Sequence, residues 1–388
     1  MFLSSCTQPV DRRISLEDWE PIENEYARSY QILRKDEQRI LISFGPAGRN
    51  DTAGIYLIGG SPVNDLQPIP QLTNVIVAST TQLPFFTSLG KEDLITGVVH
   101  LAEVFDRKIK QKASAGTIKE VGTADGMDQE LIMSLRPQAI FDHPFGRNLR
   151  GTSSQIPVIH ITEYLEQHPL GRAEWLKFFG TLLNAEEQAA ALFDRIEERY
   201  RAVTITAARN DRRPAVFFAS SWQGQWFAPP ANSYMATLIT DAAAIYALAD
   251  QEAEGNITMD LETVLHKVRR SDHFGMILSS ADSVTARVLA AGEDRLARIE
   301  AVNGGGFYGN SATTDLFGAA ILEPDVVLTD LLNIFHPDTS TAEFRYFKPL
   351  LQPIRNATDP LRAPDTADRS PAGDAAHARR SSSRSHAR

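Results

Sequence analysis

The chain has 388 residues, 43% of them apolar, and a formal net charge of −10 at pH 7, which is enough for two or three compact domains. The acidic balance argues against a general nucleic-acid-binding protein. The single cysteine excludes an internal disulfide framework and a cysteine-rich metal site, and no apolar run approaches the roughly 20 residues that span a bilayer.

Residues 1–25 are predicted to form an N-terminal tether. Leu3-Ser4-Ser5-Cys6 is similar to a lipoprotein cleavage box, in which the cysteine becomes the lipidated first residue. A charged region and an apolar stretch should precede such a box, and here only Met1 and Phe2 do. Either the true start lies upstream, or Cys6 is an ordinary cysteine; lipidation would place the protein outside the cytoplasm on a lipid anchor.

Residues 26–73 are predicted to form a hairpin and lead-in, with strands at 39–44 and 55–58. From 74 to 183, short apolar runs alternate with helical segments. This alternation is typical of a parallel α/β sheet, whose ligands bind beyond the carboxyl ends of the strands. The loops expected at that edge are Ser79–Phe86, His100–Asp106 and Asp142–Arg147.

One long helix is predicted within residues 184–208, because the run from Ala185 contains strong helix formers and no Gly or Pro. Apolar residues recur at steps of three and four, which indicates one buried stripe. Asn184 is the expected capping residue. The segments on either side resemble one another, so we interpret this helix as a rigid rod between two similar lobes.

Residues 209–350 repeat the alternation of strands and helices and form the second predicted lobe. The segment Ser220–Pro230 is expected to be a loop after the first strand, and the Gly-rich segment Asn303–Gly309 a loop leading to a helix near Thr313. Residues 351–388 are rich in Pro, Ala, Ser and Arg without apolar periodicity, which predicts a disordered basic tail.

The two predicted lobes share a short motif. Asp128 and Glu130 open a helix before a buried strand in the first lobe, and Asp260 and Glu262 do the same in the second. Asp suits a helix N-cap, and Glu in the first turn is favoured by the helix dipole. The match supports a repeat, although acids open many helices.

Several catalytic motifs are absent from the sequence. There is no Walker phosphate loop, no Gly-x-Gly-x-x-Gly after a strand and no Gly-x-Ser-x-Gly. The nine histidines are scattered. A metal-dependent hydrolase on a doubly wound α/β fold remains an alternative, with His100, Asp106 and His143 as ligands. A purely structural cell-surface interaction protein is a third interpretation of the sequence.

Aromatic residues are concentrated where the predicted crevice would lie. Aromatic side chains can stack on a bound ligand, although the same residues are equally suited to a hydrophobic core. Two tryptophans within five residues, beside Gln and Gly, are the strongest candidates. The candidate ligand-binding aromatics are Phe85, Phe86, Phe145, Trp222, Trp226, Phe307 and Tyr308.

The chain resembles a known protein family. The stretch Met127–Pro137 follows the pattern of the class III substrate-binding proteins of bacterial ABC importers, namely Asn or Asp, Leu, Glu, a helix and then Lys/Arg-Pro-Asp. Gln129 replaces the usual Leu, and Gln138 the usual Asp. The segments Glu323–Leu328 and Ile334–Pro337 are similar to the family's C-terminal end, and the resemblance covers roughly residues 74–349.

The resemblance implies an α/β fold of two lobes, each with a parallel sheet flanked by helices, joined by one long rigid helix with the ligand cleft between them. It implies a non-enzymatic, extracytoplasmic monomer that captures an iron-siderophore, haem or cobalamin type of chelate and delivers it to an ABC permease and its ATPase. No cofactor and no nucleic acid are expected. Siderophores often require basic residues, for which Arg147 and Arg150 are candidates, and Glu130 and Glu262 match the family's permease-docking glutamates. Both glutamates could also serve only as first-turn helix acids.

Overall fold

The computed structural model describes residues 16–123, 126–144, 156–222, 224–278, 295, 299–303, 305–310, 313–337 and 343–350. The chain divides into one unit, Met1–Pro353, and a second, Ile354–Arg388. The second unit and the whole of the predicted basic tail, residues 351–388, lie outside the described residues, as do Cys6, Phe145 and Arg147. Among the described residues, no helix is both long and apolar enough to cross a membrane.

An antiparallel sheet stands at the start of the fold, and β5 alone pairs in parallel. Its strands run in the order β1-β2-β3-β4-β5, with bounds Glu20–Ile22, Tyr30–Lys35, Gln38–Gly45, Gly48–Ile58 and Pro68–Ile69. β3 and β4 form the hairpin that the sequence predicted. The neighbouring strands extend this hairpin into a sheet with its own small core, which includes Trp19, Ile40, Phe44 and Leu57.

The first lobe is built on a six-stranded sheet of order β11-β10-β6-β7-β8-β9, parallel except for β9. The strands are β6 (Val75–Val77), β7 (Ile95–Val99), β8 (Lys119–Thr123), β9 (Gly126–Met127), β10 (Ala139–Asp142) and β11 (Val158–His160). The helices are α1 (Leu83–Ser88), α2 (Arg107–Ser114), α3 (Gln129–Leu135) and α4 (Pro169–Leu182), with short 3-10 turns η1 (Thr80–Gln82), η2 (Glu92–Leu94), η3 (Leu101–Glu103) and η4 (Glu163–Leu165). β6 and β10 are buried along their whole length, as expected for parallel strands that are covered on both faces.

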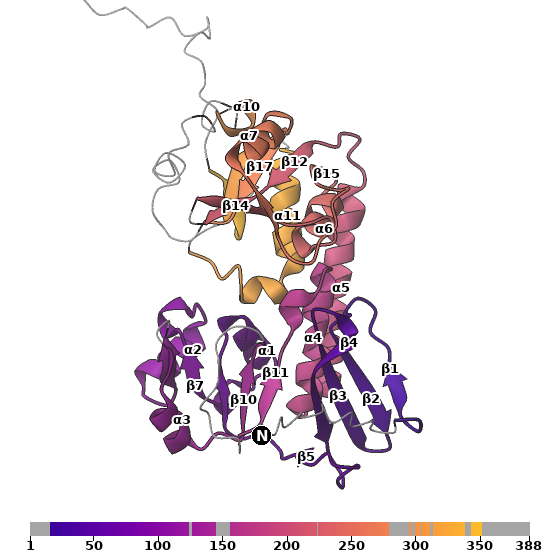
Figure 1. The fold of residues 1–388 in the computed structure, drawn as a ribbon, viewed down its shortest axis with the longest axis vertical. Coiled ribbons are helices and arrows are strands. Elements are labelled where there is room, and N and C mark those ends of the chain that lie inside the picture. Colours follow the sequence, from indigo (N-terminus) through magenta and orange to yellow (C-terminus); the bar gives the residue numbers. More distant parts are fainter. Residues whose placement is uncertain are drawn as a thin grey trace, which may run out of the picture. The chain divides into compact units, whose positions relative to one another are not determined.

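The predicted rod is α5, Glu186–Ala207. Its buried stripe includes Ala189, Phe193, Ile196 and Tyr200, and it packs against α4 on one lobe and α11 on the other (Figure 1). The expected cap is wrong in detail, because Ala185 is the N-cap and makes no side-chain cap. Asn184 instead has a φ of 53° and turns the chain between α4 and α5.

The second lobe has a five-stranded sheet of order β15-β12-β17-β18-β19, parallel except for β19, and a separate antiparallel sheet of order β13-β14-β16. The strands are β12 (Ala215–Phe218), β13 (Ser220–Trp222), β14 (Gln225–Ala228), β15 (Ile245–Tyr246), β16 (Ile257–Met259), β17 (His273–Met276), β18 (Phe307–Asn310) and β19 (Phe347–Pro349). The helices are α6 (Tyr234–Asp241), α7 (Leu261–Arg269), α10 (Glu300–Asn303), the 3-10 turn η5 (Ala319–Leu322) and α11 (Pro324–Phe335). Two parallel-sheet lobes on either side of one helix confirm the predicted fold class.

Three local predictions in the second lobe are wrong. The expected loop 220–230 is largely the β13–β14 hairpin. The Gly-rich segment contains β18, which pairs with β17 inside the sheet. The helix expected near Thr313 is instead the 3-10 turn η5, which begins at Ala319. In the hairpin, glycine lies at the turn. In the Gly-rich segment, glycine lies where the backbones of neighbouring segments approach closely.

Candidate functional site

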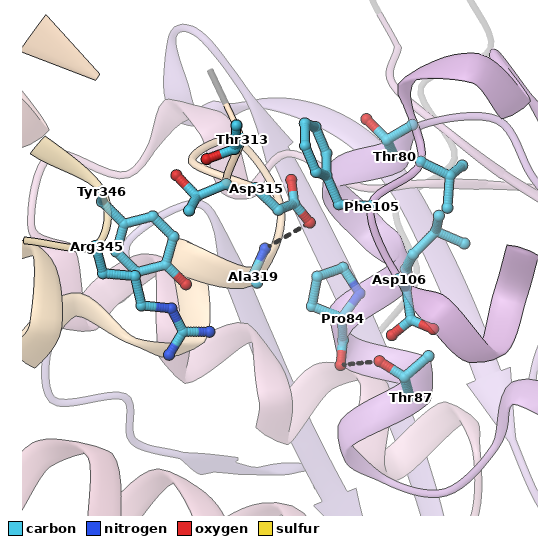
Figure 2. Close-up of a pocket in the computed structure, with 13 residues that line it drawn as sticks. Thr80, Pro84, Thr87, Phe105, Asp106, Thr313, Asp315, Ala319, Arg345 and Tyr346 are labelled. Atoms are coloured by element: carbon cyan, nitrogen blue, oxygen red, sulfur yellow. Dashed lines mark hydrogen bonds between the residues drawn. The ribbon is translucent and has the colours of Figure 1, made fainter. Parts of the chain in front are cut away.

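A cavity of about 270 Å³ lies between the two lobes (Figure 2). On the first lobe its wall follows the carboxyl ends of β6 and β7, and on the second it follows β18 and precedes β19. Its position is therefore the edge at which parallel α/β sheets bind ligands. The lining residues are Thr80, Leu83, Pro84, Thr87, Val104, Phe105, Asp106, Thr313, Thr314, Asp315, Ala319, Arg345 and Tyr346.

The first-lobe wall is held by helix-start hydrogen bonds. The Ser79 hydroxyl accepts the N–H of Thr81 at 3.3 Å and caps η1. Pro84 occupies the first turn of α1, where a missing N–H costs nothing. Asp106 accepts the N–H of Ile109 at 3.0 Å and caps α2. Two of the three loops that the sequence placed at the crevice, Ser79–Phe86 and His100–Asp106, therefore supply this wall.

The second-lobe wall is set by two carboxylates. Asp315 accepts the N–H groups of Gly318 and Ala319, both at 2.9 Å, which orders the turn into η5. Burial raises the pKa of Asp315, and the negative charges of Asp106 and Glu323 raise it further.

Asp330 fixes the residues that precede β19. It is buried on α11 and accepts the N–H groups of Arg345, Tyr346 and Phe347, the last two at 2.6 and 3.0 Å. Burial raises the pKa of Asp330, while these backbone hydrogen bonds lower it. The hydrogen bonds hold the side chains of Arg345 and Tyr346 at the cavity.

The one arginine in the cavity wall is already paired. Arg345 Nη1 lies 3.1 Å from Glu323 Oε2, and the Tyr346 hydroxyl donates to the same carboxylate. The guanidinium also lies 5.2 Å from the centre of the Tyr346 ring. Its charge is therefore largely offset by the protein itself.

A second cavity, of about 550 Å³, adjoins the first. The two share Pro84, Thr87, Asp106 and Ala319. The second extends to α5, where Leu192, Ile196 and Arg199 form part of its wall. The crevice between the lobes thus reaches the helix that joins them.

The structure places Phe85 and Phe86 in the core, and not at the cavity. Both are fully buried. Phe85 stacks on Phe179 with ring centres 4.4 Å apart, and Phe86 meets Phe141 edge-on at 5.0 Å. Their neighbours on α1, Leu83, Pro84 and Thr87, line the cavity instead. The expectation that these phenylalanines contact ligand is therefore corrected, because both rings are occupied by packing.

The same correction applies to three aromatic residues of the second lobe. Phe307 and Tyr308 are fully buried on β18, and Trp226 is 4% exposed on β14. Phe307 and Trp226 both pack against Phe274, with ring centres 5.5 and 6.3 Å away. Phe307 and Tyr308 are consecutive and therefore point to opposite faces of the sheet, and both are buried because β18 is covered on both faces.

Trp222 differs from its neighbour, because it is 64% exposed at the end of β13. It pairs with Gln225 across the hairpin, where Gly224 has a φ of 79°. It does not line either of the two cavities described above. Phe145 and Arg147 lie outside the described residues, so five of the eight predicted ligand residues are buried and one is exposed.

The predicted repeat has the same geometry in both lobes. Asp128 caps α3 by accepting the N–H of Leu131 at 2.9 Å, and Asp260 caps α7 by accepting that of Thr263 at 2.7 Å. Glu130 and Glu262 lie in the first turns of these helices and are exposed. Glu262 pairs with exposed Arg295 at 2.6 Å.

The proposed hydrolase ligands do not form a metal site in the part of the chain that the structure describes. No group of three His, Cys, Asp or Glu residues there has the arrangement needed to hold a metal ion. Asp106 caps α2, His100 precedes η3 with a φ of 52°, and His143 packs against Tyr164 at 5.2 Å.

The sequence did not identify the second-lobe wall. Asp315, Arg345 and Tyr346 have no local motif. They converge only because α11 and β19 return the chain to β18.

The comparisons with known proteins agree with the fold. A family model described as a periplasmic binding protein matches residues 75–308, which is more than half of the chain. An uncharacterised lipoprotein of Methanocaldococcus jannaschii is 26% identical over 289 residues, covering 71% of this chain and 68% of its own length.

Solved structures show the same fold. A periplasmic haem-binding protein from Pseudomonas aeruginosa superposes with a TM-score of 0.58 at 17% identity, covering 72% of this chain and 99% of its own. The siderophore-binding protein FhuD from Vibrio cholerae, solved with Fe³⁺–Desferal bound, gives a TM-score of 0.53 at 17% identity, covering 68% of this chain and 99% of its own. At these identities the match concerns the fold.

Proposed function

We propose that this chain, which belongs to the periplasmic binding protein family, is the substrate-binding component of an ABC importer. In this role it captures an iron-siderophore, haem or cobalamin type of chelate and delivers it to a membrane permease and its ATPase. The role is one of binding and release, without catalysis, and the chelate is cargo and not a resident cofactor. We propose that the protein acts as a monomer.

The observation that supports this role most directly is the position of the cavity. It lies between the lobes at the carboxyl ends of strands from both sheets, and its extension reaches α5. A ligand held there would contact both lobes at once. The haem and Fe³⁺–Desferal proteins that share the fold suggest the class of cargo.

The helix that joins the lobes affects how far they could close around the cargo. α5 contains no Gly or Pro and packs against both α4 and α11. Hinges are usually short loop or end-of-element segments that absorb large backbone changes. We therefore propose that the lobes close only slightly on the ligand.

The proposed location is outside the cytoplasm, with a lipid anchor at Cys6. The cleavage-box resemblance at Leu3–Cys6 and the M. jannaschii lipoprotein relative both support this location. A tether of this kind would keep the protein close to its permease.

Direct binding tests the proposal. Haem, ferric Desferal and cobinamide are titrated into the purified full chain by isothermal titration calorimetry. We expect saturable binding of at least one of them with a stoichiometry of one. The absence of saturable binding for all three would contradict the proposed cargo class.

A further inference from the structure

The second cavity is the larger of the two and adjoins the first. It encloses about 550 Å³ and shares four lining residues with its neighbour, all labelled in Figure 2, namely Pro84, Thr87, Asp106 and Ala319. Protein sites for small molecules usually enclose about 300–1,000 Å³. The first cavity, at about 270 Å³, falls just below this range, and the second falls within it. A chelate that is too large for the first cavity can therefore continue into the second.

Three helical segments give the second cavity an apolar floor. Leu192 and Ile196 are four residues apart on α5 and therefore share one face of that helix. Leu322 of η5 and Pro84 of α1 border the same space. Ile196 and Leu322 are already buried, at 1% and 8% exposure, whereas Leu192 and Pro84 are half-buried. Leu192 and Pro84 thus present apolar surface, from two different helices, that a ligand could cover.

The polar side chains around this floor are mostly engaged within the protein. The hydroxyls of Thr87 and Ser88 donate to carbonyl oxygens of their own helix. Exposed Arg107 is one of the five charged lining residues. Each of the other four interacts with another residue: Arg199 with Asp325, Lys108 with Glu92, Glu323 with Arg345, and Asp106 with the N–H of Ile109. Because paired charges are less available to a ligand, the cavity offers mainly its apolar floor.

We infer that the second cavity binds the hydrocarbon portion of the cargo against Leu192 and Ile196, so that the helix joining the lobes forms one wall of the binding site. This inference rests on the proposed function and narrows the cargo to chelates that carry an apolar arm or macrocycle edge. Covering the half-buried apolar surface removes it from water, which favours binding. A small hydrophilic chelate in the first cavity would leave this surface exposed.

A homologous ligand series tests the inference. The probes are ferric complexes of Desferal acylated on its terminal amine with an acetyl, butanoyl or hexanoyl group. The three complexes have the same charge and the same iron site, and they differ only in the number of methylene groups. Burial of one methylene group strengthens binding by a factor of roughly four. Isothermal titration calorimetry should therefore show that wild-type protein binds the hexanoyl complex roughly tenfold or more tightly than the acetyl complex, even with partial burial of the chain.

Substitutions at Leu192 locate this gain in the second cavity. Leu192→Trp narrows the cavity, and Leu192→Gln keeps a good helix former while making the wall polar. Either change should reduce the gain with chain length to about twofold or less and should leave the affinity for the acetyl complex nearly unchanged. Ile205→Trp is the control, because Ile205 is 61% exposed on the same helix and lines neither cavity. Circular dichroism checks that each variant is folded.

The same variants test cargo that has no acyl chain. Haem and cobinamide carry their hydrocarbon surface on a macrocycle. If either binds the wild-type protein, Leu192→Trp and Leu192→Gln should each weaken that binding by roughly threefold or more, whereas Ile205→Trp should not.

The outcomes separate the inference from the function on which it rests. If the three ferric complexes bind the wild-type protein equally well, or if both Leu192 variants keep the full gain, the inference is wrong while chelate binding stands. For a bound macrocycle, unchanged affinity in both Leu192 variants would overturn the inference in the same way. If the ferric complexes, haem and cobinamide all fail to bind, the proposed function fails and the inference fails with it.

Discussion

Glu174 Oε2 accepts a hydrogen bond from the backbone N–H of Tyr26 at 2.9 Å, although the two residues are 148 positions apart. Glu174 is fully buried on α4 and also accepts the N–H groups of Glu25 and Ala27, at 3.0 and 2.8 Å. Lys177 lies 2.7 Å from the same carboxylate and balances its charge. The N-terminal sheet, which precedes the region matched by the family model, is thus fixed to the first lobe through a backbone segment.

This contact predicts that Glu174 stabilises the N-terminal sheet. Glu174→Ala removes the acceptor for three N–H groups and should lower the free energy of unfolding by about 3–5 kcal/mol. Glu174→Gln keeps one acceptor oxygen and should cost less. Urea unfolding measures both variants, with Glu187→Ala on the exposed side of α5 as control. Equal midpoints for Glu174→Ala and the wild type would contradict the prediction.

The two tryptophans of the hairpin should behave differently when each is truncated. Trp226 is buried against Phe274, so Trp226→Ala should lower the free energy of unfolding by about 3–5 kcal/mol. Exposed Trp222→Ala should change it by less than about 0.5 kcal/mol.

Trp222 is also tested as a candidate for ligand contact. If Trp222 stacks on the cargo, Trp222→Ala weakens binding by about 0.5–1.5 kcal/mol without affecting folding. Isothermal titration calorimetry is the suitable measurement, because Trp222→Ala removes the tryptophan whose fluorescence would otherwise report binding. An unchanged affinity would leave Trp222 without a role in binding.

Buried His273 predicts a specific loss of stability in acid. Burial lowers its pKa to about 4, partly opposed by the negative charge of Asp272. The unfolded chain therefore binds a proton near pH 6.5 that the folded chain does not. The contribution of His273 to stability is complete above that pH and is lost as the pH falls towards 4.

Between about pH 7 and about pH 4.5, wild-type protein should lose about 2–3 kcal/mol more stability than His273→Leu, because the variant lacks this titration. Urea unfolding at the two pH values measures the difference. His266→Leu, at an exposed position of α7, controls for loss of an imidazole. Parallel pH dependence in the wild type and His273→Leu would show that the histidine does not titrate as described.

The lipid anchor is tested at Cys6. Cells that express the protein from its natural start should incorporate radiolabelled palmitate, and Cys6→Ser should abolish the label. Cys6→Ser leaves the chain otherwise intact, so unchanged expression by immunoblot is the control. Absence of label in the wild type, with a verified upstream leader, would leave Cys6 as an ordinary residue.

Much of the fold followed from periodicity and composition. Buried strands such as β6 were predictable because a short run of β-branched apolar residues favours a strand, and α5 because an apolar stripe with a period of 3.6 residues favours a helix. The resemblance to class III binding proteins is confirmed by the family match and by the shared fold. The match of Asp128 and Asp260 as helix caps explains why a local motif could be found in both lobes.

The cavity was only half predictable. The loop that contains Asp106 was placed at the crevice because the end of a parallel strand fixes its position. The wall that contains Asp315 and Tyr346 depends on contacts between distant segments. Aromatic residues were poor guides, because a ring such as Phe307 serves a core as readily as a ligand.

Glu130 and Glu262 are the remaining predicted functional pair, and their geometry suits docking on a permease. Each is an exposed first-turn acid on a helix capped in the same way, one on each lobe. Because one continuous helix joins the lobes, these two acidic side chains could bind two basic sites of the permease at the same time. Both side chains of the ion pair between Glu262 and Arg295 are exposed, so the pair contributes little stability. Glu262 could therefore leave Arg295 and pair with a basic residue of the permease.

Reversing both charges should therefore separate docking from ligand capture. Glu130→Arg with Glu262→Arg should leave chelate affinity nearly unchanged, because neither residue lines a described cavity. The same double variant should abolish ligand-stimulated ATP hydrolysis by the partner importer in proteoliposomes, while each single reversal keeps a fraction of it. Exposed charges act mainly on the rate and orientation of association, so added salt should weaken stimulation by the wild type as well. Normal stimulation by the double variant would reduce both glutamates to helix-start acids that favour the dipole by a few tenths of a kcal/mol.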